Sequence, residues 1–112
     1  VYGEDYARTR MSSESYALLQ ELRRQIKNIT EYEEKINKHF IGFKNNQNYF
    51  GILRWRMGYI SFVISGFRGE IPDDKENMEY YPKKQKLVIK MYSKDEILRY
   101  LPLIKRSKMF KA

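Results

Sequence analysis

The sequence predicts an α+β domain in which helices cover one face of a small antiparallel sheet. Three short runs rich in aromatic and β-branched residues follow one another within residues 40–67, separated only by turns that contain Asn or Gly. Turns this short leave no room for crossover helices, so the runs predict a three-stranded antiparallel meander. Leucine and isoleucine recur at helical spacing on both sides of this segment, which predicts flanking helices.

The first helix is expected to begin at Ser12 or Ser13, either of which can cap it, and to run to about Asn28. The residues of its apolar stripe are Leu18, Leu19, Leu22, Ile26 and Ile29. Residues 1–11 show no periodicity and are interpreted as an incoming linker, which leaves residues 12–112 as one domain. Because the chain starts with Val, we expect it to be the C-terminal module of a longer protein.

Thr30-x-x-Glu33 matches a capping box and predicts a short second helix. The predicted strands are Phe40–Lys44, Tyr49–Trp55, Tyr59–Ser65 and, further along, Lys86–Tyr92. In the second strand, alternation places Phe50 and Ile52 on one face with Arg54. In the third strand, it turns Ile60, Phe62 and Ile64 toward the helices.

Residues 66–82 are rich in Gly, Pro and acidic residues and predict a long surface loop. A second capping box, Ser93-x-x-Glu96, starts the last helix, which is expected to pack on the sheet. Pro102 should kink this helix or start a new turn. The core is predicted to contain Leu22, Ile60, Phe62, Ile64, Leu87 or Val88, Ile97, Leu98 and Leu101.

The absence of cysteine excludes disulfides and thiolate metal sites, and it favours an intracellular, cytoplasmic location. No apolar run approaches the roughly 20 residues of a membrane span, so we expect no membrane partner. The net charge is +8, and it is unevenly placed. Residues 1–82 hold 12 basic and 12 acidic residues, whereas residues 83–112 hold 10 basic residues against two acidic ones. A one-sided basic field favours polyanionic partners, although a solubilising surface is the plain alternative.

The sequence offers few residues for catalysis, and we expect no catalytic site, metal or cofactor. His39 is the only histidine and is expected to be partly buried at a junction between elements. Pro72-Asp73-Asp74 invites comparison with the magnesium site of restriction-type nucleases, but the acidic residue of the following strand's acidic-x-Lys triplet is missing. Glu33-Glu34-Lys35 has that triplet at the wrong place in the order, on a predicted helix.

The candidate binding residues are basic side chains able to contact phosphate, together with aromatic side chains able to stack on bases. The candidate phosphate contacts are Lys83, Lys84, Lys86, Lys90, Arg99, Lys105, Arg106, Lys108, Arg54 and Arg56. The stacking candidates are Tyr49, Trp55 and Tyr59, for which plain packing on half-buried strands is the alternative.

Phe40-Ile41-Gly42-Phe43-Lys44, Tyr92-Ser93-Lys94-Asp95-Glu96 and Leu101-Pro102-Leu103-Ile104-Lys105-Arg106-Ser107 carry a family resemblance. With these motifs, residues 39–107 resemble a small domain of unknown function. That domain ends many bacterial and archaeal proteins described as predicted transport proteins or predicted restriction-type endonucleases. The loop before the fourth strand departs from the family pattern. The resemblance implies an accessory role beside a nuclease and supplies no catalytic residues.

We therefore expect a non-catalytic accessory module of a nucleic-acid-processing protein that binds the nucleic-acid backbone through its basic C-terminal third. DNA is expected rather than RNA, and the upstream domain of the same chain is expected as a second partner. The alternative is a protein-interaction domain whose basic helix docks on an acidic surface. A divergent magnesium-dependent nuclease is the third alternative.

Overall fold

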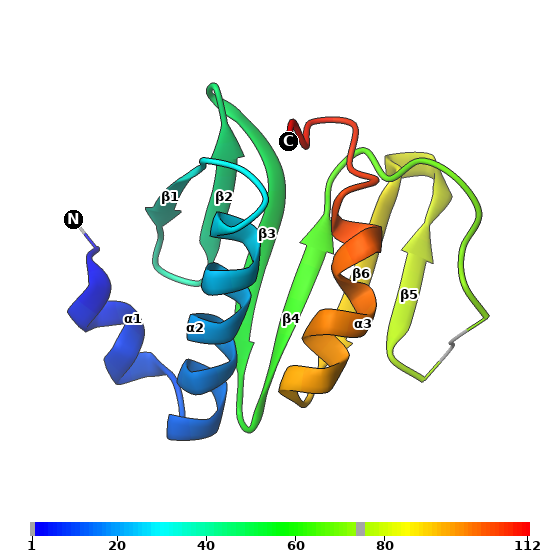
Figure 1. The fold of residues 1–112 in the computed structure, drawn as a ribbon. Helices are drawn as coiled ribbons and strands as arrows, with labels where there is room; N and C mark the ends of the chain where they lie inside the picture. Colours follow the sequence, from blue (N-terminus) through cyan, green and yellow to red (C-terminus); the bar gives the residue numbers. More distant parts are fainter. Residues whose placement is uncertain (1, 74–75) are drawn as a thin grey trace.

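The computed structural model describes residues 2–73 and 76–112. Within these residues it contains three α-helices, one 3₁₀ turn and six strands (Figure 1). The helices are α1 (Glu4–Arg10), α2 (Ser13–Lys27) and α3 (Lys94–Ile104), and the 3₁₀ turn is η1 (Pro82–Lys84). The strands are β1 (Glu33–Ile36), β2 (Ile41–Asn45), β3 (Asn48–Arg56), β4 (Tyr59–Ile64), β5 (Met78–Tyr81) and β6 (Lys86–Met91).

The six strands form one antiparallel sheet in the order β1-β2-β3-β4-β6-β5. Helices α2 and α3 lie beside each other on one face of this sheet, and α1 lies on the same side next to α2 (Figure 1). The predicted α+β class, with the C-terminal helix packed on the sheet, is confirmed. None of the described helices covers the opposite face, which we call the open face.

The core lies between the sheet and the two long helices. Phe62 on β4 is fully buried and pairs in register with Leu53 on β3 and Ile89 on β6. The predictions for Ile60, Phe62, Ile64, Leu87, Leu22 and Ile97 are confirmed, because all six are fully buried. Leu98 was wrongly assigned to the core and is 51% exposed, while Leu101 is half-buried. The buried stripe of α3 consists of Ile97, Tyr100, Leu103 and Ile104.

The predicted starts of the two long helices are correct. Ser12 caps α2 by accepting a hydrogen bond from the backbone N–H of Ser15. Ser93 caps α3 in the same way, and the Glu96 carboxylate accepts from the backbone N–H of Tyr92, which completes the capping box. Pro102 lies inside α3, which continues past it to Ile104 as one helix.

Two predictions for the N-terminal third were wrong. Residues 1–11, interpreted as a linker, contain α1, whose Ala7 is fully buried. The capping box at Thr30 does not start a helix, because Glu33–Ile36 pairs with β2 as an edge strand instead. The adjacent Tyr32 stacks on Phe43, with ring centroids 5.3 Å apart, so tertiary contacts override the local helix signal.

The segment 66–82, predicted as a loop, ends in strand β5. Met78 is buried and Tyr80 is half-buried, since both point to the helix side, whereas Glu79 and Tyr81 point to the open face. Alternation over only four residues gave too weak a signal to mark this strand in the sequence. The remaining predicted strands agree with the observed ones to within one residue at each end.

The pairing of β2 with β3 contains one irregularity. The register shifts between Phe43, which faces Gly51, and Lys44, which faces Tyr49. Phe50 is the extra residue, and the resulting bulge lets it join Leu53 in the core although the two have opposite parity. The prediction that Phe50 shares a face with Ile52 and Arg54 was therefore wrong for Phe50.

A polar network connects α1, α2 and β1. Arg23 on α2 is 17% exposed and donates to the carboxylates of both Glu4 and Glu34 at 2.8 Å. The hydroxyl of Tyr16 donates to Glu4, and that of Tyr32 donates to Glu34. The hydrogen bond from Arg23 lowers the pKa of the Glu4 carboxyl below its usual value. This network is the described ionic link between α1 and the sheet.

The first prediction compares two glycines on neighbouring strands. A Cβ atom at Gly51 would overlap the ring of Phe62, whereas a Cβ at Gly42 would overlap the ring of Tyr49. Phe62 is fully buried and cannot move, but Tyr49 is half-buried on the open face and can swing away. We expect Gly51→Ala to lower the free energy of unfolding by about 1–3 kcal/mol, the usual cost of overpacking. We expect Gly42→Ala to cost less than about 1 kcal/mol. Urea unfolding of the two variants measures both values, and equal losses would contradict this account.

The second prediction concerns how the packing of α1 changes at low pH. Because the pKa of Glu4 is lower in the folded chain than its ordinary value of 4.5, its contribution to stability is complete above pH 4.5. That contribution is lost as the pH falls through the folded pKa. Tyr6 on α1 lies 6.5 Å from Trp55, the only tryptophan, so Trp55 fluorescence reports on the position of α1. We expect Glu4→Gln to shift this fluorescence toward its acid value already at neutral pH.

Glu4 is partly exposed, so the expected loss of unfolding free energy at neutral pH is only about 0.2–1 kcal/mol. Glu31→Gln is the matched control, since Glu31 is an exposed carboxylate outside the described ion pairs. The same acid transition of Trp55 in Glu4→Gln and in the native sequence would show that this network does not hold α1.

Candidate functional site

The open face is lined by every second residue of the six strands. The pairing register shows which residues belong to this face. Arg54, Ser61 and Lys90 lie opposite one another on β3, β4 and β6, and each is next in sequence to a residue of the buried row Leu53, Phe62 and Ile89. The ring of Tyr49 also lies on this side, over Gly42. The main residues are Lys35, Lys44, Tyr49, Ile52, Arg54, Arg56, Tyr59, Ser61, Val63, Glu79, Tyr81, Lys86, Val88 and Lys90.

The inner strands give this face a positive charge. No Asp or Glu occurs between Lys35 and Gly69, and β6 has none either, so β2, β3, β4 and β6 contribute only basic charges. The two carboxylates on the face, Glu33 and Glu79, belong to the edge strands β1 and β5. Six basic side chains therefore stand against two acidic ones, a net charge of +4. The basic residues are Lys35, Lys44, Arg54, Arg56, Lys86 and Lys90.

Aromatic rings alternate with these cations. Tyr59 and Tyr92 stack with their ring centroids 4.7 Å apart, and Tyr92 is 51% exposed. The ammonium group of Lys44 lies 5.6 Å from the ring centroid of Tyr49. The guanidinium of Arg54 lies 5.8 Å from the ring centroid of Phe40, just before β2. The face thus offers flat rings and positive groups side by side.

The cations of the open face are not neutralised within the described part of the chain. The ion pairs found there join α1, α2 and β1, or neighbouring residues of one helix, and none of them involves an open-face cation. Arg56 donates only to the backbone carbonyl of Trp55. The positive charge of the face is therefore available to an anion from outside the domain.

A hollow of ≈ 330 Å³ lies over β4 on this face. Its lining residues are Arg54, Arg56, Tyr59, Ser61, Val63, Glu79, Tyr81, Val88 and Lys90. The hydroxyl of Tyr81 donates to the Glu79 carboxylate at 2.6 Å, and this bond raises the pKa of Tyr81. Ser61 forms the floor and is only 5% exposed.

The structure separates the predicted site residues into two groups. Arg54, Arg56, Lys86, Lys90, Tyr49 and Tyr59 share the open face. Lys83 and Lys84 are exposed in η1, which forms the β5–β6 connection. Arg99, Lys105, Arg106 and Lys108 belong to α3 and the segment after it, on the helix side.

Two predicted site residues have structural partners on the helix side. Arg106 donates to the backbone carbonyls of Arg68 and Glu70, and its guanidinium packs 4.6 Å from the ring centroid of Phe67. Trp55 pairs with Ile60 in register and packs edge-on against Tyr6 of α1, so it does not stand beside Tyr49 and Tyr59. The single basic surface expected from residues 83–111 is thus divided between two faces.

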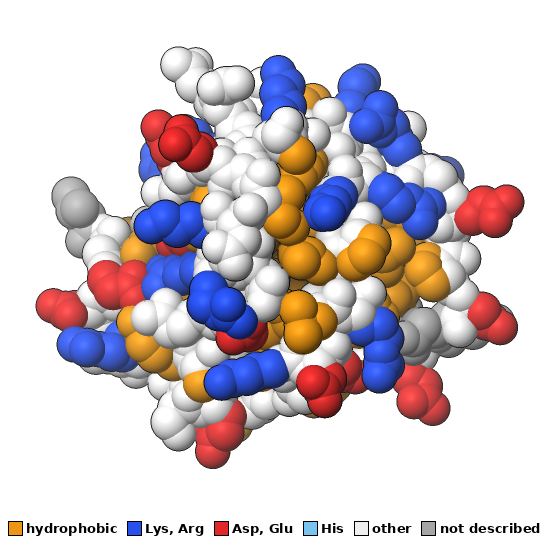
Figure 2. Space-filling model, viewed as in Figure 1, with side chains coloured by type: hydrophobic (Ala, Val, Ile, Leu, Met, Phe, Trp, Pro, Cys, Tyr) orange, Lys and Arg blue, Asp and Glu red, His pale blue; other side chains and the backbone are white. Residues whose placement is uncertain are grey.

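The helix side has a different character. Figure 2 shows Lys and Arg side chains dispersed among Asp and Glu there, with apolar side chains collected between the two long helices. Sequence reasoning missed Phe40, Lys35, Lys44, Ser61 and Tyr92 as members of the site. The signal that identifies them is strand alternation, read with the one-residue shift in the β2–β3 pairing.

The described carboxylates of the nuclease alternative lie on separate elements. Glu33-Glu34-Lys35 lies on strand β1 rather than on the predicted helix, and Asp73 precedes β5 at the opposite edge of the sheet. Strands β1 and β5 are the two edges of the sheet and are five strand spacings apart, about 24 Å at about 4.8 Å each. Asp74 lies outside the described residues. Among the described residues, no cluster of three His, Cys, Asp or Glu side chains could hold a metal ion, and His39 is exposed rather than partly buried.

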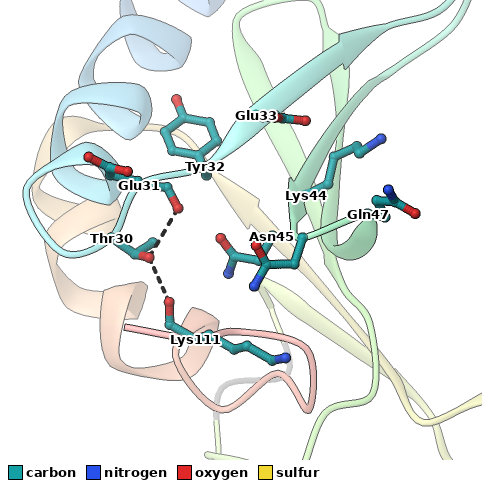
Figure 3. A pocket seen from close by; sticks show the side chains of 9 residues that line it. Thr30, Glu31, Tyr32, Glu33, Lys44, Asn45, Gln47 and Lys111 are labelled. Carbon is teal, nitrogen blue, oxygen red and sulfur yellow. Dashed lines mark hydrogen bonds between the residues drawn. The ribbon is translucent and has the colours of Figure 1, made fainter.

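A second hollow, of ≈ 530 Å³, lies near the C-terminal end of the chain (Figure 3). The hydroxyl of Thr30 bonds to the backbone carbonyl of Lys111 at 2.6 Å and fastens the C-terminal segment there. In Figure 3 the carboxylate of Glu31 and the ammonium of Lys111 extend to opposite sides, so the charges around this hollow do not converge on one ligand. We assign it a structural role.

Comparisons with protein-family models, with curated proteins and with solved structures found no match for this chain. The family resemblance noted in the sequence therefore stays a prediction. In the described part of the chain, no helix is long and apolar enough to cross a membrane.

The third prediction tests whether the cations of the open face repel one another in the folded chain. Replacing Arg54, Arg56 and Lys90 with Ala removes like charges that have no described acidic partner. We expect the triple variant to change the free energy of unfolding by less than about 0.5 kcal/mol at physiological salt. At about 10 mM salt, where screening is weak, it should be at least as stable as the native sequence. Thermal unfolding at the two salt concentrations measures this, and a large loss of stability would show that these side chains are structural.

Proposed function

We propose that this domain binds single-stranded nucleic acid along its open face, as a non-catalytic accessory module of a larger nucleic-acid-processing protein. One observation carries the proposal: aromatic rings and unneutralised cations alternate on a sheet face whose four inner strands contain no carboxylate. Cations attract the phosphates of a strand, and exposed rings stack on its bases, whatever the sequence.

The shape of the face favours a single strand over a duplex. The rings of Tyr49, Tyr59 and Tyr92 lie on or beside the surface of the sheet, where only unpaired bases can reach them. In a duplex the bases stack on each other, so only the cations would contribute. The resemblance to domains attached to nucleases favours DNA over RNA and is consistent with a cytoplasmic protein. The alternative is that the upstream part of the same chain occupies this face, and the test below distinguishes the two.

The fourth prediction uses salt to locate the contacts. Each phosphate contact to a single strand releases counterions and changes the slope of log affinity against log salt by about −0.7. If three to five of the open-face cations contact phosphates, a slope of roughly −2 to −3.5 is expected for a labelled single-stranded DNA followed by fluorescence anisotropy. The Arg54→Ala, Arg56→Ala, Lys90→Ala variant should bind more weakly and with a slope flatter by about 2.

The matched control removes the same number of charges from the helix side, as Arg99→Ala, Lys105→Ala, Lys108→Ala. We expect its slope to stay within about 0.7 of the native value. If the control loses as much slope as the open-face variant, the charge effect is not local and the assignment to the open face is wrong. If no binding is seen at about 20 mM salt, where phosphate contacts are strongest, the nucleic-acid proposal fails. The open face is then better explained as a docking surface for the upstream part of the chain.

A further inference from the structure

One row of the open face contains a serine between two cations. Arg54 on β3 lies opposite Ser61 on β4, and Ser61 lies opposite Lys90 on β6. Neighbouring strands are about 4.8 Å apart, so the two basic residues leave the sheet about 10 Å from each other, with Ser61 midway. Both basic side chains are long enough to reach a ligand above the serine, although the guanidinium of Arg54 packs against Phe40 in this structure and would have to turn toward β4. All three residues line the hollow over β4.

Ser61 has no structural task that the described contacts reveal. The Ser61 residue is only 5% exposed, and its hydroxyl forms none of the described side-chain hydrogen bonds. The comparable buried serines, Ser15 and Ser107, both donate to backbone carbonyls. No buried side-chain nitrogen or oxygen among the described residues lacks a hydrogen-bond partner, so the Ser61 hydroxyl reaches the solvent of the hollow, where it is free to bond to a ligand.

We infer that this hollow is a seat for a terminal phosphate group, held by Arg54, Ser61 and Lys90. A terminal phosphate has three free oxygens and carries a charge of about −1.5 to −2 at neutral pH. A phosphate inside a strand has only two free oxygens and one charge. Three donor groups around one point match the terminal phosphate better, and a concave hollow suits a chain end better than a chain that must enter and leave.

The rest of the lining suits the remainder of a nucleotide. Val63 and Val88 form the next row of the sheet, an apolar floor for a sugar or a base. Glu79 lies beyond them on the edge strand, opposite Val88, and already accepts a hydrogen bond from Tyr81. Its negative charge is therefore outside the row that would hold the phosphate. Arg56 adds a further positive charge at the other side of the hollow.

The part of this inference that concerns a strand end depends on the function proposed above, whereas the phosphate seat itself does not. The test compares three versions of one single-stranded DNA: with a 5′-phosphate, with a 3′-phosphate, and with hydroxyls at both ends. Inorganic phosphate and a nucleoside monophosphate are added as free sources of the same group. Affinity is measured by anisotropy, and binding of the free compounds is followed by the backbone amide signal of Ser61 in NMR spectra.

We expect a terminal phosphate at one end to tighten binding by about fivefold, the value of one net hydrogen bond. Ser61→Ala should abolish this gain, measured as the ratio of the affinities of the phosphorylated and the all-hydroxyl strand for the same variant. Ser61→Thr keeps the hydroxyl and should retain the gain. Ser65→Ala is the matched control, because it makes the same change just after the end of β4 and outside the lining of the hollow. Circular dichroism and thermal unfolding establish that each variant is folded.

The outcomes separate the two proposals. Strands that bind equally well with and without a terminal phosphate would overturn the seat while leaving the proposed function intact. If no strand binds but inorganic phosphate or the monophosphate shifts the Ser61 signal, the seat stands and the proposed function fails. An end-phosphate gain that survives in Ser61→Ala would also overturn the seat, because the hydroxyl would then contribute nothing.

Discussion

The arrangement of this molecule depends on the parity of its strands. Each residue of β2 to β6 faces either the helices or the open side, and a shift of one position would exchange the two sets. The pairing of Leu53, Phe62 and Ile89 fixes the buried row, and the packing of Phe62 against Gly51 fixes it further. Once that row is set, Arg54, Ser61 and Lys90 have no place except the open face. The core therefore determines the composition of the candidate site.

The positive charge of the open face results from where the carboxylates are used. Glu4 and Glu34 are held by Arg23, and Glu21 is held by Arg24, all on the helix side or at the edge of the sheet. Glu70, Asp73 and Glu76 lie in the connection to β5, Glu79 lies on the edge strand β5 itself, and Asp95 and Glu96 lie in the first turn of α3. None of them returns to the inner strands. A chain segment with zero net charge in the sequence thus supplies four of the six cations on one face.

Much of the fold could be predicted from the sequence, because its signals are local. The caps at Ser12 and Ser93 and the apolar periods marked the two long helices, and the aromatic runs marked four strands. The missed elements lack such signals. Strand β1 forms although the sequence there matches a helix capping box, because Tyr32 packs against β2 and Glu34 pairs with Arg23 on α2. Helix α1 depends on Arg23, 19 residues away in the sequence.

The candidate site was predicted only in part, for a related reason. Arg54, Arg56, Lys90, Tyr49 and Tyr59 were all named as candidates, and the structure places them on one face. Simple alternation puts Tyr49 on the face opposite Arg54, because the bulge at Phe50 is not visible in the sequence. The sequence did not predict that the C-terminal cations are divided between two faces, because this division depends on the side of the sheet on which α3 packs. Nothing in the sequence marks Ser61, since a serine on a strand is ordinary until its position between Arg54 and Lys90 is known.

The two edge strands have a consequence for how this chain behaves at high concentration. A sheet with free edges can recruit a strand from another copy and grow into a polymer. Here β1 and β5 have only four residues each, β1 carries three charged side chains in its first three positions, and β5 is followed directly by Pro82, which has no N–H to donate. Short, charged and proline-terminated edges resist such recruitment. The chain can therefore keep one sheet face bare and basic without its edges templating the assembly of insoluble fibres.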